Sequence, residues 1–62
     1  MVMTATTLYG LQRRGQWLTA PANPPTFGTE PIWAVPTLQQ ALEKAQLIKF
    51  THGLSAEPRR IP

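Results

Sequence analysis

The chain has 62 residues and a net charge of +3, from six lysines and arginines against three acids, and it contains no cysteine. This length allows one small domain, and the lack of cysteine excludes both a disulfide-stapled fold and a thiolate metal site. His52 and the three glutamates (Glu30, Glu43, Glu57) show no metal-ligand spacing, so we expect neither a metal nor another cofactor. No leader pattern and no long apolar window occurs, which favours a cytoplasmic protein without a membrane segment.

Residues 1–6 have no apolar anchor and are predicted to form a flexible N-terminus. Residues 7–12, TLYGLQ, and residues 16–20, QWLTA, are rich in strand formers and predict a β-hairpin around Gly15. This hairpin begins a single small domain, for which the sequence predicts the bounds 7–53.

Two registers of this hairpin are possible. A three-residue loop, residues 13–15, places Leu11 opposite Trp17 and puts the large side chains on one face. A two-residue loop, residues 14–15, pairs Leu11 with Leu18 and turns Trp17 to the other face. We prefer the first register because aromatic cross-strand contacts stabilise a sheet.

The next segment, residues 21–31, holds four prolines and is predicted to be a surface loop. Residues 32–35, IWAV, are β-branched and aromatic and end at Pro36. They predict a short third strand.

The helix has the clearest pattern in the chain. Thr37 and Gln40 form a capping-box pattern, and Gly53 suits the position after the last helical turn. An apolar stripe at helical spacing joins them, formed by Leu38, Ala41, Leu42, Ala45 and Ile48. Residues 54–62 are polar and contain proline, which predicts a disordered C-terminal tail.

The predicted fold is α+β, with a hairpin and a short third strand in an antiparallel sheet packed against one amphipathic helix. The predicted core consists of Tyr9, Leu11, Trp17, Phe27, Trp33 or Ile32, Val35, Leu38, Leu42, Ala45 and Ile48.

Catalysis is not expected. The chain has no aspartate or cysteine, and its one serine, Ser55, lies in the predicted tail, so the sequence indicates no nucleophile held against a base. His52 falls at the predicted helix end, where a histidine usually interacts with the last carbonyls.

Binding to a protein is the favoured function. The paired arginines suit an acidic partner, and an exposed tryptophan beside them is typical of an interface. The residues predicted to bind the partner are Arg13, Arg14, Trp17, Trp33, Arg59 and Arg60. Two alternatives remain open: a homodimer that buries the exposed aromatics, and nucleic-acid binding through the basic hairpin tip with a tryptophan stacked on a base. The end of the chain, EPRRIP, is either a linear binding motif or a solvated terminus.

Residues 9–18 follow the pattern Y-x-L-x-x-x-G-x-W-L, and residues 37–45 read TLQQALEKA. Together with the irregular segment between them, they resemble small orphan proteins of phages and prophages, over residues 9–48. The resemblance implies an inhibitor or adaptor that binds a host protein complex, such as RNA polymerase or a defence complex, in the host cytoplasm. It assigns no role to any residue.

Overall fold

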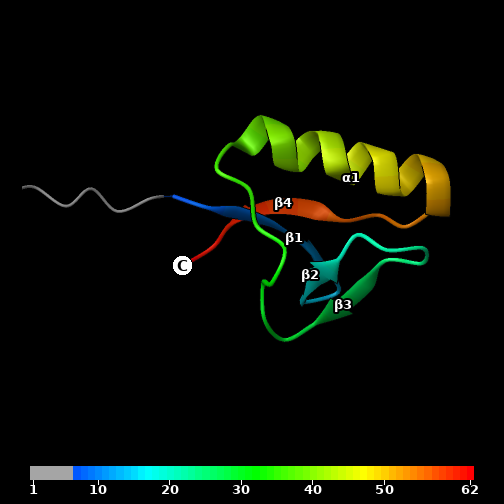
Figure 1. The fold of residues 1–62 in the computed structure, drawn as a ribbon, viewed down its shortest axis with the longest axis horizontal. Coiled ribbons are helices and arrows are strands. Elements are labelled where there is room, and N and C mark those ends of the chain that lie inside the picture. The colour runs from blue at the N-terminus through cyan, green and yellow to red at the C-terminus, as the bar shows by residue number, and fades with distance from the viewer. Residues whose placement is uncertain (1–6) are drawn as a thin grey trace, which may run out of the picture.

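A computed structural model describes residues 7–62 of the chain, and the predicted flexible N-terminus, residues 1–6, lies outside this range. It contains a four-stranded antiparallel sheet with one helix packed against it (Figure 1), which confirms the α+β class. In chain order the elements are β1 (Tyr9–Arg13), β2 (Gln16–Ala20), β3 (Thr26–Gly28), α1 (Leu38–His52) and β4 (Glu57–Arg60). The strand order in the sheet is β3-β2-β1-β4.

The hairpin of β1 and β2 has the two-residue turn, so the preferred register is wrong and the alternative is correct. Gln12 pairs with Trp17, and this register places Leu11 opposite Leu18. The turn residues Arg14 and Gly15 both have positive φ, 54° and 79°. This is the geometry of a type I′ turn, whose twist matches that of the two strands. The register also directs two fully buried leucines toward the helix.

The third strand is not at residues 32–35. Instead β3 lies inside the proline-rich segment that we predicted to be a loop, and its Phe27 pairs with Leu18 of β2. A short edge strand tolerates neighbouring prolines because its outer side needs no donors. Val35 still touches the sheet, through an isolated bridge in which it exchanges hydrogen bonds of 2.8 and 2.9 Å with Tyr9. This bridge fixes the chain where it enters the helix.

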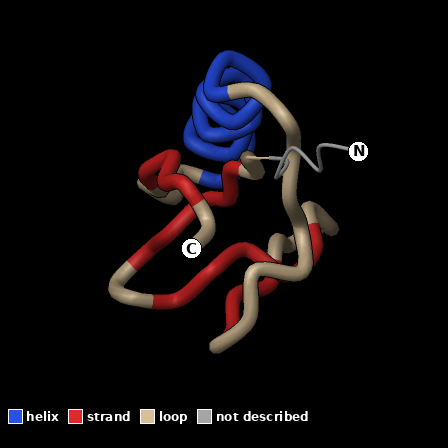
Figure 2. Tube along the Cα trace, turned by 90° about the vertical axis from the view of Figure 1, so that its left-hand side faces the viewer, coloured by secondary structure: helices blue, strands red, loops and turns tan. Residues whose placement is uncertain are grey.

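The helix α1 agrees with its prediction at both ends. The Thr37 hydroxyl oxygen accepts a hydrogen bond from the Gln40 backbone N–H at 3.2 Å. Gly53 adopts the left-handed conformation, with φ of 69°, and its N–H donates to the Lys49 carbonyl at 2.9 Å. Both contacts satisfy backbone groups that have no partner within a helix. The helix forms its own layer on one side of the sheet (Figure 2).

The predicted disordered tail is wrong for Glu57–Arg60. These residues form β4, which pairs along β1 and completes the sheet after the helix. The Ile61 N–H donates to the Leu8 carbonyl at 2.8 Å, so alternate residues of β4 bond toward β1. Pro58 falls on the other alternation and has no N–H to offer at the free edge. Local sequence gives no strand pattern here because the neighbouring strand supplies the pairing.

The core is smaller than predicted and is centred on the contact of the helix with the sheet. Its buried residues are Leu11, Leu18, Ala41, Ala45 and Ile48. Partly buried residues around them are Tyr9, Phe27, Trp33, Val35, Leu54 and Ala56. Leu38 and Leu42 were predicted to be in the core, but they remain 47% and 44% exposed at the border of the helix contact. Ile32 is exposed, and Trp17 lies on the sheet face opposite to the helix.

Candidate partner-binding site

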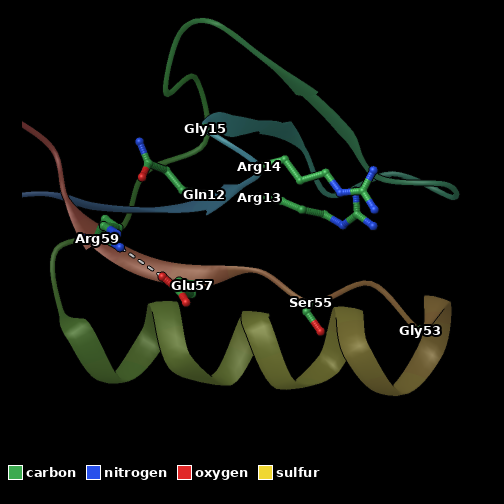
Figure 3. A pocket seen from close by; sticks show the side chains of 8 residues that line it. All are labelled: Gln12, Arg13, Arg14, Gly15, Gly53, Ser55, Glu57 and Arg59. Carbon is green, nitrogen blue, oxygen red and sulfur yellow. Dashed lines mark hydrogen bonds and ion pairs between the residues drawn. The ribbon is translucent and has the colours of Figure 1, made fainter.

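Three of the six predicted binding residues line one hollow beside the hairpin tip. We call this hollow the arginine pocket, and its volume is about 480 Å³. Its lining residues are Gln12, Arg13, Arg14, Gly15, Gly53, Ser55, Glu57 and Arg59 (Figure 3). The prediction placed Arg13 and Arg14 at the tip but gave no reason for Arg59 to lie near them.

Two segments that are distant in sequence build the walls of the arginine pocket. One wall is the end of the hairpin, where β1 passes into the Arg14-Gly15 turn. The other begins at Gly53, whose left-handed conformation ends α1 and turns the chain back toward β4. From Gly53 to Arg59 every second residue lines the pocket. The direct pairing of Gln12 with Glu57 joins the two walls.

Arg13 has a hydrogen-bond donor without a partner. Its Nε is buried, and no acceptor among residues 7–62 bonds to it. An unsatisfied buried donor costs about 1–3 kcal/mol. The Arg13 and Arg14 side chains extend in the same direction from the tip (Figure 3). Because this Nε has no exposed surface, an acceptor from another molecule would reach it only if the Arg13 side chain moved.

Arg14 occupies a backbone conformation that arginine rarely adopts. Its φ of 54° lies in the left-handed region, which costs an L-residue with a side chain of this size about 1–2 kcal/mol. Asparagine followed by glycine is the usual pair in a type I′ turn. The tip thus places a positive charge at a position where the backbone favours a different residue.

The arginine pocket keeps an excess of positive charge. Arg59 forms an ion pair with Glu57, with 3.0 Å between its Nη2 and the carboxylate Oε2. Both side chains are well exposed, so this pair is weak and open to exchange. Gly53 ends α1, whose last carbonyls carry about half a negative charge. Two guanidinium groups, those of Arg13 and Arg14, exceed that partial charge and make the pocket suitable for an anionic group.

The other predicted residues lie outside the arginine pocket. Trp17 does not line the pocket, although its cross-strand partner Gln12 does; it covers Gly10 on the sheet face opposite to the helix, where a Cβ atom on Gly10 would be 3.0 Å from the indole Cε3. Trp33 packs partly against the core, and its backbone N–H donates to the Leu18 carbonyl at 3.2 Å. Arg60 is exposed and pairs with Tyr9, which puts it on the opposite face of β4 from Arg59.

Five pocket residues were not predicted to bind a partner: Gln12, Gly15, Gly53, Ser55 and Glu57. Only the dipeptide Arg14-Gly15 carried a sequence indication of the pocket's geometry, because a glycine at the second turn position favours the two-residue loop. Glu57 was considered as a metal ligand and as part of the segment EPRRIP. Its position beside Arg59 depends on the pairing of β4 with β1, which no local pattern reveals.

The part of the chain that the structure describes holds neither a metal-binding cluster nor a membrane-spanning helix. Residues 7–62 contain no group of three side chains placed to hold a metal ion. In the same range, no helix has the length and apolar character needed to cross a membrane. Comparison with known proteins finds no matching family model, no matching curated protein and no matching solved structure.

Proposed function

We propose that this chain is a small protein-binding domain that uses the arginine pocket to bind acidic side chains of a partner protein. The observation that carries the proposal is the meeting of Arg13, Arg14 and Arg59 in one hollow with a single carboxylate among them. Guanidinium groups bind carboxylates through paired, charge-assisted hydrogen bonds. The exposed side chains of Arg14 and Arg59 supply such donors.

The distribution of charge favours a protein over a nucleic acid as the partner. A nucleic-acid surface carries a stripe of cations that follows the phosphates. Here the remaining cations are dispersed, with Lys44 and Lys49 on α1 and Arg60 on the opposite face of β4. Glu57 lies within the pocket and would repel a phosphate backbone.

The resemblance to small phage and prophage proteins supports an inhibitor or adaptor role. It favours a host protein complex as the partner, with the host cytoplasm as the place of binding. A domain with five buried hydrophobic residues has a small interior, so contact with a larger partner would add apolar burial that the free chain lacks.

The test is affinity capture of the tagged chain from a nuclease-treated bacterial lysate, followed by mass spectrometry. Arg13→Ala with Arg14→Ala removes two charges from the pocket, and Lys44→Ala with Arg60→Ala removes two charges outside it. We expect one stoichiometric partner that is retained by the native chain and the control pair and is lost by the pocket pair. Partners that disappear with the nuclease would make nucleic acid the ligand, and recovery of the chain alone would indicate self-association; either result overturns the proposal.

Salt dependence gives an independent check with the captured partner. Screening weakens contacts between exposed charges, so the affinity falls as ionic strength rises. Binding to nucleic acid follows a steeper law, in which each phosphate contact contributes a slope of about one in the logarithm of affinity against the logarithm of salt. An affinity that is independent of salt would contradict a role for the arginines.

A further inference from the structure

A second hollow lies between the helix and the edge strand. We call it the helix groove, and its volume is about 230 Å³. It is lined by Leu42, Ala45, Gln46, Lys49, Ser55, Ala56 and Pro58. Apart from Gln46, Lys49 and Ser55, these side chains are apolar. Leu42 is 44% exposed there, so part of its apolar surface still faces water in the free chain.

The helix groove and the arginine pocket meet at one residue. Ser55 lines both hollows, and the residues after it alternate between them. Glu57 and Arg59 line the arginine pocket, whereas Ala56 and Pro58 line the groove. A chain that crosses the free edge of the sheet at Ser55 therefore reaches both hollows.

The free edge itself limits how such a chain is held. Pro58 has no N–H, and its alternation with Ile61, which bonds to β1, places it on the outward side. Addition of a further strand needs a regular ladder of donors and acceptors along that edge. A bound chain would therefore be recognised by its side chains rather than by strand pairing.

Resting on the proposed function, we infer that the partner presents one linear acidic segment that carries a large apolar anchor. The anchor enters the helix groove, whose volume suits one leucine or phenylalanine side chain. The acidic side chains reach Arg13 and Arg14, and Lys49 at the groove favours a further acid beside the anchor. Because Ser55 lines both hollows, the anchor and the acids lie within a short stretch of the segment.

The experiment selects displayed random peptides of about twelve residues, long enough to span both hollows, on the immobilised 62-residue chain. We expect enriched peptides to combine a large apolar residue with at least one acid within such a stretch. A synthetic copy of an enriched peptide is then titrated against two matched variants of the chain. These are Leu42→Glu in the groove and Leu47→Glu on the outward face of α1. These leucines are 44% and 50% exposed, and both substitutions add the same charge.

Leu42→Glu should weaken the peptide by at least about tenfold, and Leu47→Glu by less than about twofold, since tenfold corresponds to the loss of a well-buried anchor. Lys49→Glu against Lys44→Glu repeats the comparison if Leu42→Glu fails to fold by circular dichroism. The inference would be overturned if the two variants of each pair changed the peptide affinity equally. Enriched peptides without acidic residues would also overturn it. If the lysate yields a partner that needs Arg13 and Arg14 but no such peptide is enriched, the linear-segment inference is overturned and the protein-binding function stands. If neither experiment finds binding that depends on these arginines, both are overturned.

Discussion

Replacing Arg14 by asparagine is expected to stabilise the fold while it weakens binding. Arg14 is held at φ of 54° by the type I′ turn that the register of β1 and β2 requires. Asparagine enters the left-handed region at lower cost because its short side chain bonds to the local backbone. The substitution removes strain without deleting a buried contact, since Arg14 is exposed.

The magnitude follows from the conformational cost. The left-handed conformation costs arginine about 1–2 kcal/mol, and asparagine recovers part of this, so the free energy of unfolding should rise by about 0.5–1 kcal/mol. For a domain of this size, that change raises Tm by about 2–8 °C. Urea unfolding followed by circular dichroism measures the free energy, and a thermal scan measures Tm.

Arg14→Gln is the matched control. It removes the same charge at the same position, but it keeps a long side chain that gains nothing in the left-handed region. We expect no gain in stability from it, although both variants should lose affinity for an acidic partner. If Arg14→Asn fails to stabilise the chain relative to Arg14→Gln, the turn is not strained and the reasoning is refuted.

Three further substitutions have expected outcomes. Gly10→Ala should lower the free energy of unfolding by about 1–2 kcal/mol, because its Cβ would lie 3.0 Å from the Trp17 ring; a Trp17→Leu background should abolish this loss in urea titrations. Gly53→Ala should lower it by about 1 kcal/mol, because φ of 69° is unfavourable for alanine; an unchanged urea midpoint would contradict that reading of the helix end. Glu57→Gln frees Arg59 and should raise the affinity for the captured partner about two- to fivefold by calorimetry, whereas a loss of affinity would show that Glu57 contributes to binding.

The helix was predictable from sequence because its determinants are local. The Thr37 cap, the apolar spacing and Gly53 all act within a few residues, and each is found where the pattern placed it. The burial of its stripe was predicted less well. Leu42 lies at the border of the contact with the sheet, and a helical period alone does not show how wide that contact is.

The sheet was harder to predict because its pairings are remote in sequence. In the hairpin, contacts between aromatic side chains favour the three-residue loop, but turn geometry and the burial of Leu11 with Leu18 determine the register. The strand β4 has no local pattern at all, since its residues EPRR are polar and include a proline. The position of Arg59 in the arginine pocket follows from that strand alone, and so half of the site was beyond local sequence reasoning.

The arginine pocket concentrates two energetic costs in a domain that has little stability to lose. The strain at Arg14 and the unpartnered Nε of Arg13 together cost about 2–5 kcal/mol, a large share of what a chain with five buried hydrophobic residues gains on folding. Neither cost serves the fold, because asparagine would form the same turn and a shorter side chain would leave no buried donor. The strain at Arg14 is explained if this residue is kept for binding, since its charge can pair with a carboxylate from a partner. A partner present at about one hundred times its Kd adds about 2.7 kcal/mol to the stability of the folded chain. Binding of a partner at this site would therefore offset a deficit of the size that the site itself creates.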